Sequence, residues 1–198
     1  MPVIGITGGI STGKSTFCDC LRRLLPQATF FDADQAAHDL VENDLEVKKL
    51  IRSEFGDAVF FENGDLNRAQ MRSIVFGDPE KRRVLEQILH PRIRRQWSLG
   101  SQNRRNSTDL FFADIPLLYE TNGETLCDSV VVVACSPRVQ LERLTVRTGL
   151  DRFEAEKMIH SQMPLAEKIR RADHVIWNNG SAETLSAQTG LLTKYWQG

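Results

Sequence analysis

The amino-acid sequence predicts an α/β fold in which helices cover both faces of a doubly wound, five-stranded parallel sheet. Five short segments are rich in β-branched or aromatic residues, and helical patterns separate them along the chain. That alternation is typical of strands that pair in parallel through helical crossovers. The predicted strands are residues 3–7, 29–32, 110–114, 129–135 and 174–178.

The connection between the second and third predicted strands, residues 33–109, is far longer than a single crossover requires. It carries amphipathic helical patterns, so we expect a helical insertion, with Pro79 opening one of its helices. His90-Pro91 should bend or restart that helix, because proline disfavours helical geometry in the residue before it.

A second helical excursion, residues 137–172, separates the fourth and fifth predicted strands and should be broken near Gly149 and Pro164. The sequence shows no internal repeat and no low-complexity tract. We therefore expect one globular unit that carries two helical additions.

The composition is that of an ordinary globular protein. The chain has 198 residues, 41% of them apolar and 26% charged, and a formal net charge of -1. These values argue against a disordered or fibrous chain and give no general reason to expect nucleic-acid binding. The longest strongly apolar run, residues 130–135, is far shorter than the roughly 20 residues of a membrane-spanning helix. With no recognisable secretory signal, the sequence predicts a cytoplasmic protein that binds neither membrane nor nucleic acid.

Charge is balanced over the whole chain but not locally. Residues 30–66 hold ten acidic side chains against three basic ones, whereas residues 78–105 hold eight basic side chains against three acidic ones. The basic stretch is a place where an anionic substrate could lie, and a solvated helix face is the alternative.

The four cysteines, Cys18, Cys20, Cys127 and Cys135, are too few for a disulfide scaffold in a chain of this length. We therefore expect reduced thiols. Cys18 and Cys20 have no second ligand pair at zinc spacing, so we expect both to pack on a helix rather than bind a metal.

The strongest motif lies between the first predicted strand and a predicted helix. Residues 8–15 read Gly-Gly-Ile-Ser-Thr-Gly-Lys-Ser and fit the phosphate-loop pattern G-x-x-x-x-G-K-[ST]. Such a loop turns its N–H groups inward around phosphate oxygens, in conformations that a Cβ obstructs. Lys14 should then reach the β and γ phosphates of a nucleoside triphosphate, and Ser15 should ligate Mg²⁺. The dipole of the following helix favours the same anion.

Three carboxylates stand at the carboxyl ends of predicted strands, the edge at which a doubly wound sheet binds ligands. Asp32 and Asp34 follow the second strand. Their positions favour Asp34 as the base that accepts a proton from an attacking hydroxyl, and Asp32 as a structural or metal-side partner. One of the two can instead simply cap the next helix. Asp114 ends the third strand, where we expect an orienting or metal-linked role.

Gln140, Arg143 and Arg147 share one helical face by their spacing, just after the fourth predicted strand. Arginines on a helix that folds over the phosphates would stabilise charge on the transferred group. Ordinary surface ion pairs, for example with Glu142, are the alternative.

These motifs indicate phosphoryl transfer from a nucleoside triphosphate without naming the acceptor. A GTP-dependent switch would need an Asn-Lys-x-Asp segment after a late strand, and the sequence has none. The alternatives are a P-loop kinase acting on another small-molecule or nucleoside alcohol, and a nucleotide-binding regulatory module without catalysis.

Together the motifs resemble the dephospho-coenzyme A kinase family, along almost the whole chain. The phosphate loop, and residues 32–34 with His38, are similar to the family's first two blocks, and Arg68 lies in a block that resembles its insertion. Residues 89–94 and 114–120 match further blocks. The late positions of the pattern are Gln140, Arg143, Arg147, Gln162, Ala172, Asp173 and Asn178.

The resemblance implies transfer of the γ-phosphate of ATP, with Mg²⁺, to the ribose 3′-hydroxyl of dephospho-coenzyme A, the last step of coenzyme A biosynthesis. It implies a single P-loop kinase-like unit over residues 1–198, and we favour a monomer. The core would comprise about residues 1–33, 108–138 and 172–198, a helical coenzyme A-binding insertion about residues 34–107, and a helical lid about residues 139–171.

The resemblance also implies roles for individual residues. Asp34 would be the catalytic base, and Lys14, Arg143 and Arg147 would act on the transferring phosphate. The ATP site would comprise Gly8, Gly9, Ser11, Thr12, Gly13, Lys14, Ser15, Thr16 and Asn178. The dephospho-coenzyme A site would comprise Asp32, His38, Arg68, His90, Arg94, Asp114 and Leu118.

Three positions depart from the family pattern. Ser11-Thr12 replaces the commoner Gly-Ser of the phosphate loop, so we expect a local backbone change with ATP binding retained. Tyr119 stands where phenylalanine is usual, which should cost little if its hydroxyl reaches solvent or a partner. Trp177 stands where a polar residue is usual, next to the loop expected to approach the adenine of ATP.

Overall fold

The computed structural model describes residues 2–102 and 109–197, and the chain folds into two compact units. The first unit comprises Met1–Phe31 and Asn103–Gly198, and the second comprises Asp32–Gln102. The predicted end of the insertion, at about residue 107, lies outside the described residues. No helix within the described ranges has the length and apolar character needed to span a membrane.

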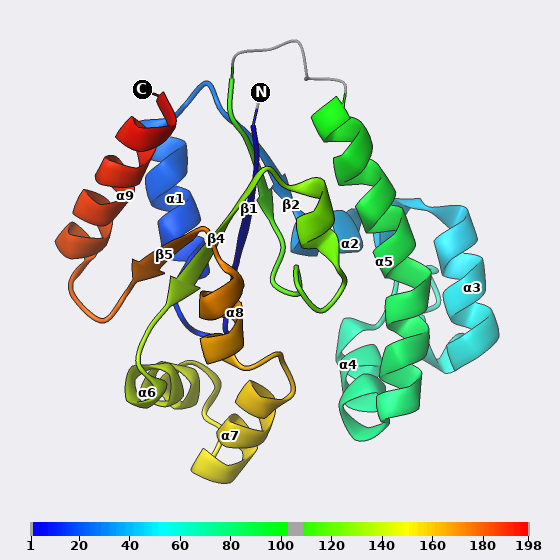
Figure 1. Cartoon of the computed structure of the whole chain (residues 1–198). Helices are drawn as coiled ribbons and strands as arrows, with labels where there is room; N and C mark the ends of the chain where they lie inside the picture. The colour runs from blue at the N-terminus through cyan, green and yellow to red at the C-terminus, as the bar shows by residue number, and fades with distance from the viewer. Residues whose placement is uncertain (1, 103–108, 198) are drawn as a thin grey trace. The chain divides into compact units, whose positions relative to one another are not determined.

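A five-stranded sheet forms the centre of the first unit, in the order β2-β3-β1-β4-β5 (Figure 1). β1 pairs in parallel with both β3 and β4, and β4 pairs in parallel with β5. The predicted α/β class is confirmed, and every predicted strand is present to within one residue at each end. The strands are β1 (Val3–Gly8), β2 (Thr29–Asp32), β3 (Phe111–Asp114), β4 (Ser129–Ala134) and β5 (His174–Trp177).

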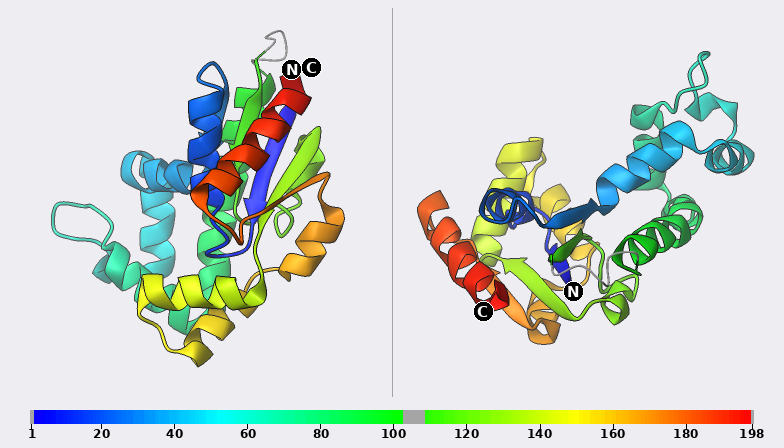
Figure 2. Two further views of the ribbon diagram at one scale, coloured as in Figure 1. Left: turned by 90° about the vertical axis from the view of Figure 1, so that its left-hand side faces the viewer. Right: turned by 90° about the horizontal axis from the view of Figure 1, so that it is seen from above.

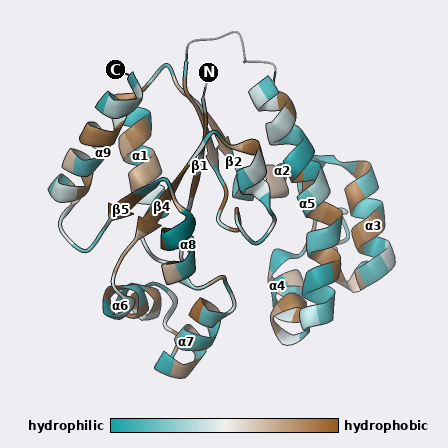
Figure 3. Ribbon diagram, in the orientation of Figure 1, coloured by the Kyte–Doolittle hydropathy of each residue, from teal (hydrophilic) through white to brown (hydrophobic). Residues whose placement is uncertain are grey.

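Helices cover both faces of the sheet, because its central strands are apolar on both sides. α1 (Lys14–Leu24) and α9 (Ala182–Gln197) lie side by side on one face, where Ile4 and Ile6 of β1 join their core. α8 (Leu165–Arg171) packs against β4 on the other face (Figures 1 and 2). Figure 3 shows the strongly apolar residues gathered on β1, β4 and β5.

Three helices lie between β4 and β5. α6 (Pro137–Thr148) ends at Gly149, which takes a positive φ of 71° at the C-cap. α7 (Arg152–His160) follows, and α8 begins directly after Pro164. The predicted breaks near Gly149 and Pro164 are therefore confirmed.

The second unit is helical and has an apolar core of its own. It contains α2 (Ala33–Asn43), α3 (Leu45–Phe55), α4 (Arg68–Gly77) and α5 (Pro79–Gln102). A short 3-10 turn, Asp57–Val59, follows α3. All of these elements contribute to the core, whose buried members are Leu40, Val41, Val47, Ile51, Val59, Met71 and Ile88.

Of the two outcomes predicted for His90-Pro91, a bend or a restart of the helix, the restart is wrong, because α5 continues through Pro91 as one helix. Ile88 before the proline and Ile93 after it pack into the same core, which holds both halves of the helix in place. Tertiary packing here outweighs the roughly 3 kcal/mol that a proline in a helix interior costs.

Candidate active site

The loop between β1 and α1, residues 8–15, has the backbone of an anion cradle. A Cβ on Gly8 would lie 2.5 Å from the carbonyl oxygen of Val133, so β4 approaches too closely for any side chain there. Gly13 takes φ 95° and ψ 24°, in the left-handed region that glycine adopts without strain. Close packing therefore requires glycine at position 8, and the backbone conformation favours glycine at position 13.

α1 begins directly after Gly13, and no side chain caps its first N–H groups. Its first turn contains no acidic residue, whereas Arg22 and Arg23 lie in its last turn. The positive end of the helix dipole and the free N–H groups are therefore available to an anion. Ser15 and Thr16, in the same first turn, are both exposed.

Ser11 shows the backbone change expected from the departure in the loop. Its φ is 58°, a left-handed value that only Ser11 and Asn122 adopt among the described non-glycine residues. The Ser11 hydroxyl is buried and has no hydrogen-bond partner within the described chain. A buried hydroxyl without a partner inside an anion cradle suits a ligand oxygen as the missing acceptor.

Lys14 forms an ion pair with Asp114 at the end of β3. The two side chains are only 15% and 7% exposed, so the pair is largely desolvated. The Cys18 thiol donates to the other Asp114 oxygen at 3.3 Å, and burial, reinforced by that carboxylate, raises the pKa of Cys18. Cys18 and Cys20 are both buried on α1, as predicted for packing residues.

Two glutamines hold the backbone of Ile10 in the loop. Gln140 Nε2 donates to the Ile10 carbonyl at 2.9 Å, and the Ile10 N–H donates to Gln162 Oε1 at 3.0 Å. Gln140 lies on α6 and Gln162 lies between α7 and α8. Both backbone groups of one loop residue are therefore fixed by the segment that follows β4.

The carbonyl of Thr12 accepts from two further side chains, Asn178 Nδ2 at 2.9 Å and Arg143 Nη1 at 3.4 Å. Asn178 is buried, so its amide supports the loop, and Trp177 before it is 48% exposed. Arg147, farther along α6, is exposed. Of the two arginines predicted to act on the phosphate, the structure places only Arg143 against the loop.

Lys168, which the sequence-based predictions did not include, is completely buried. Its Nζ donates to Gly8 O at 3.2 Å, Pro116 O at 3.0 Å and Glu120 Oε1 at 2.8 Å. Burial lowers the pKa of this amine, and the Glu120 carboxylate opposes the shift. One signal was available in the sequence, because a spacing of three residues puts Lys168 on the same helical face as Leu165.

Asp32 and Asp34 take different roles in the structure. Asp32 caps α2, and its Oδ1 accepts from the backbone N–H groups of Asp34 at 2.9 Å and Gln35 at 3.0 Å. The capping alternative is therefore confirmed for Asp32. Asp34 is exposed in the first turn of α2.

Four residues predicted to bind the second substrate lie on helices of the second unit. His38 is exposed on α2, and Arg68 begins α4, where it pairs with Glu42. His90 is half-buried in α5, and Arg94 lies one turn farther along that helix. Burial lowers the pKa of His90 below its ordinary value of 6.5.

Leu118 and Tyr119, in the turn after β3, are both buried. A Cβ on Gly5 would lie 2.8 Å from a Leu118 methyl group, so Leu118 packs in the core of the first unit and its predicted substrate contact does not fit this burial. Arg171 lies over the Tyr119 ring at 4.3 Å. The Tyr119 hydroxyl is buried and finds no hydrogen-bond partner within the described residues, so the condition for a harmless replacement is not met.

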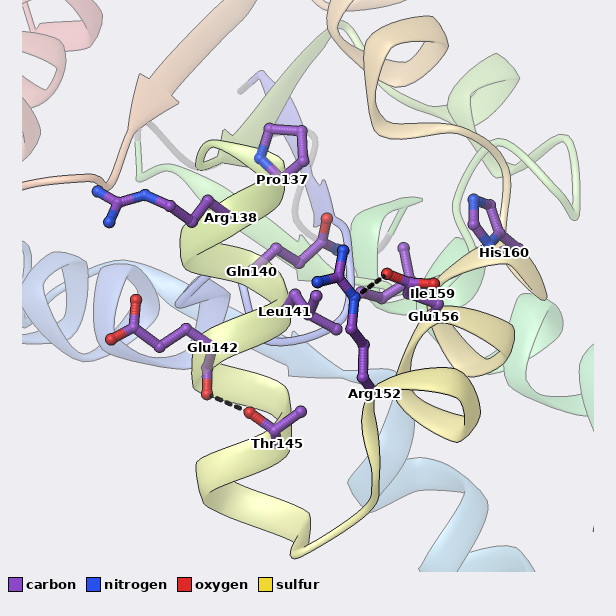
Figure 4. A pocket seen from close by; sticks show the side chains of 10 residues that line it. All are labelled: Pro137, Arg138, Gln140, Leu141, Glu142, Thr145, Arg152, Glu156, Ile159 and His160. Carbon is purple, nitrogen blue, oxygen red and sulfur yellow. Dashed lines mark hydrogen bonds and ion pairs between the residues drawn. The ribbon is translucent and has the colours of Figure 1, made fainter.

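A pocket of about 630 Å³ lies between α6 and α7 (Figure 4). Arg152 pairs with Glu156 one turn along α7, and Leu141 and Ile159 supply apolar walls. Gln140 lines this pocket and also holds Ile10. The pocket therefore belongs to the α6–α7 segment and shares Gln140 with the contacts that hold the phosphate loop.

Comparison with known proteins decides the family. The sequence model of dephospho-CoA kinase matches residues 2–184. The chain belongs to the dephospho-CoA kinase family. A dephospho-CoA kinase of Bacillus cereus is 40% identical over 195 residues, 98% of this chain and 96% of the relative. One from Listeria monocytogenes is 41% identical over 194 residues, 96% of this chain and 95% of the relative. The predicted family and the predicted activity, an ATP-dependent dephospho-CoA kinase of coenzyme A biosynthesis, are confirmed.

Solved structures agree on the fold. Dephospho-CoA kinase from Campylobacter jejuni superposes with a TM-score of 0.69 at 27% identity, over 100% of this chain and 98% of that one. A Thermus thermophilus protein superposes with a TM-score of 0.75 at 34% identity, over 98% of this chain and 97% of that one. A shikimate kinase from Aquifex aeolicus, 14% identical with a TM-score of 0.53 over 97% and 96%, shares the fold alone. The predicted P-loop kinase-like fold is therefore confirmed.

Proposed function

We propose that residues 8–15 bind the triphosphate of ATP and that the chain transfers its γ-phosphate to the ribose 3′-hydroxyl of dephospho-CoA. The observation that carries this proposal is the uncapped N-terminus of α1, flanked by Lys14 and by Arg143. Phosphoryl transfer depends on positioning and on neutralising charge around the transferred group. An anion cradle with two nearby cations meets both needs.

Within this proposal each residue has a distinct task. Lys14 exchanges its pairing with Asp114 for phosphate oxygens, and Arg143 adds a second positive charge beside the loop. The Ser11 hydroxyl donates to a phosphate oxygen that supplies its missing partner. Asp34 accepts the proton of the 3′-hydroxyl as that oxygen attacks phosphorus.

Mg²⁺ would be held beside the phosphates by Ser15. The Ser15 side chain is exposed in the first turn of α1, so its oxygen is open to a hard cation that prefers oxygen ligands. When bound, the ion neutralises charge on the β and γ phosphates.

The proposal also covers the larger parts of the chain. Residues 34–107 would bind dephospho-CoA, with His38, Arg68, His90 and Arg94 as candidate contacts, and residues 139–171 would form a lid that carries Arg147. We still predict that the protein is a monomer and lies in the cytoplasm. The excess of basic side chains in residues 78–105 supports an anionic substrate in the helical insertion.

The test incubates the pure protein with Mg-ATP and dephospho-CoA and measures coenzyme A. Asp34→Asn should lower kcat by about 100- to 10,000-fold, the range for a lost general base. Asp39→Asn, which removes another exposed carboxylate of α2, is the matched control and should leave kcat unchanged. Absence of product from folded wild-type protein would overturn the proposal. A panel of other alcohols, nucleosides included, tests the choice of acceptor.

A further inference from the structure

Lys168 is buried among acceptors from three separate parts of the chain. Gly8 O belongs to the start of the phosphate loop, Pro116 O follows β3, and Glu120 lies in the turn after it. An ammonium group has three hydrogens, and each has one acceptor here. Since no donor is left for a ligand, Lys168 cannot be a substrate contact in this arrangement.

Stability alone does not account for a charge in this position. Taking a lysine out of water costs several kcal/mol, and replacing a buried ion pair with apolar residues of similar volume is often neutral or stabilising. The Lys168 side chain is 0% exposed, and that of Glu120 is 21% exposed. What an apolar side chain cannot supply is the direction of three hydrogen bonds, which points to a geometric role.

The bond to Gly8 bears directly on the phosphate loop. By accepting from Lys168, the Gly8 carbonyl keeps its oxygen turned toward the buried ammonium and away from the cradle. A carbonyl oxygen turned into the cradle would repel phosphate, because the loop binds anions through inward N–H groups. Lys168 therefore supports the loop orientation that an anion requires.

The bond to Pro116 ties the loop to the strand that carries Asp114. The Pro116 carbonyl accepts from Lys168 at 3.0 Å and also from Thr7 Oγ1 at 2.9 Å. The ends of β1 and β3 are thus joined through one oxygen. β1 leads into the loop before Lys14, and β3 ends at Asp114, with which Lys14 forms its ion pair.

The bond to Glu120 extends the network to the turn between α7 and α8. Glu120 Oε1 also accepts from the backbone N–H of Met163 at 3.0 Å. The neighbouring Gln162 holds Ile10 of the loop. Two adjacent residues of this turn are therefore connected to the phosphate loop, one directly and the other through Glu120 and Lys168.

We propose that Lys168 is a positioning residue, which with Glu120 fixes the phosphate loop in its anion-binding geometry and joins it to the α7–α8 turn. The inference rests on the proposed function, since the ligand whose binding is set up in this way is the phosphate chain of ATP. Neither residue touches the reacting atoms. Their effect passes through the Gly8 and Pro116 carbonyls.

The test uses the double variant K168M/E120Q. Methionine keeps most of the apolar stem, and glutamine keeps an oxygen for the Met163 N–H, so no unpaired charge is left buried. Arg170→Met, an exposed residue of the same helix, is the matched control. For each protein the measurements are the urea midpoint, the affinity for ADP by calorimetry, and kcat/KM for ATP and for dephospho-CoA.

We expect K168M/E120Q to keep a urea midpoint near that of the wild type while kcat/KM for ATP falls on the order of 100-fold, the cost of a small misplacement of reacting groups. ADP affinity should fall as well, whereas KM for dephospho-CoA should stay the same. The R170M control should match the wild type in all of these measurements. An ADP affinity per folded molecule equal to that of the wild type would overturn the inference.

A second variant covers the case in which the double variant does not fold. Lys168→Gln keeps two donors and removes the charge, and its ADP affinity should lie below that of the wild type. Wild-type ADP affinity in K168Q would overturn the inference. ADP binding does not involve the acceptor, so these results are independent of whether dephospho-CoA is the substrate.

Discussion

Lys14 and Asp114 form an ion pair between the first turn of α1 and the end of β3, and both side chains are largely buried. The carboxylate of Asp114, on the neighbouring strand, therefore orients the Lys14 side chain. Asp114 also accepts from Cys18, so its two oxygens both have partners. This explains why an aspartate ends β3 although no glutamate follows it to activate water.

Lys14→Met should impair both folding stability and ATP use. Breaking a buried pair on one side leaves an uncompensated charge, so we expect the free energy of unfolding to fall by about 3 kcal/mol. Adding Asp114→Asn removes that charge and should restore most of the stability, but not the activity, because the phosphate still lacks its cation. Urea unfolding and kcat/KM for ATP separate the two effects. Restored activity in the double variant would show that Lys14 serves only to neutralise Asp114.

Gly13→Ala should be much more harmful than the same change at Gly149. Both glycines have positive φ, 95° and 71°, so both variants bear the cost of roughly 1 to 2 kcal/mol for a left-handed residue. At Gly13 the new Cβ would also lie 2.0 Å from Asn178 Nδ2, whereas nothing lies within 4 Å at Gly149. We expect ATP affinity to fall only in the Gly13 variant, and Asn178→Ala to recover part of the lost stability. Equal thermal midpoints for the two single variants would contradict the steric argument.

The sheet and the phosphate loop could be predicted from the sequence because their signals are local. Buried parallel strands are continuous apolar runs, and the loop has fixed spacing between Gly8, Gly13 and Lys14. The position of Asp32 after the second strand allowed either a helix cap or a partner role on the metal side. The hydrogen bonds that Asp32 accepts from the backbone of α2 show that it caps the helix.

The family resemblance assigned Asn178 to the ATP site, but the individual contacts that support the loop could not be predicted because they join distant parts of the chain. Lys168 reaches Gly8 across 160 positions, and Asn178 reaches Thr12 across 166. A lysine in a short helix is normally exposed, and only the packing of α8 against β4 makes this one internal. The continuity of α5 through Pro91 has a similar cause, since core packing on both sides of the proline overrides its local preference.

Ser11→Gly should stabilise the protein without ligand and lower its affinity for ATP, because it removes the hydroxyl proposed to donate to a phosphate oxygen. A serine at φ 58° is strained by roughly 1 to 2 kcal/mol, and glycine removes that strain at some cost in chain entropy. We expect a net gain of about 1 kcal/mol, or roughly 2 to 4 °C in thermal midpoint for a chain of this size. Asn122→Gly, at φ 51°, is the control and should gain less, because asparagine tolerates the left-handed region better. An unchanged ATP affinity in Ser11→Gly would show that the hydroxyl makes no phosphate contact.

His90 should make the stability of the protein depend on pH. Burial lowers its pKa below 6.5, with Glu86 opposing the shift, so the folded protein binds fewer protons there than the unfolded chain. The stabilisation is complete above pH 6.5 and is lost as the pH falls through the lower folded-state pKa. His90→Gln should flatten the dependence of unfolding free energy on pH between about pH 5 and 7. An unchanged slope in that range would show that His90 titrates normally.

Tyr119→Phe should raise the stability of the protein, although it removes a polar group. The Tyr119 hydroxyl is buried without a partner in the described structure, and burial raises the pKa of Tyr119 to about 12, so the group stays protonated. An unsatisfied buried hydroxyl costs roughly 1 to 3 kcal/mol, which phenylalanine would recover, while the aromatic face under Arg171 is kept.

The matched control for this change is Tyr195→Phe, because Tyr195 is 70% exposed and its ring packs edge-on against His174. Phenylalanine preserves that ring contact, so the free energy of unfolding should change by less than about 0.5 kcal/mol. Both variants are compared with the wild type by urea unfolding at neutral pH. If Tyr119→Phe is less stable than the wild type, the hydroxyl has an acceptor such as a buried water, and the usual phenylalanine is then no better suited to this chain than tyrosine.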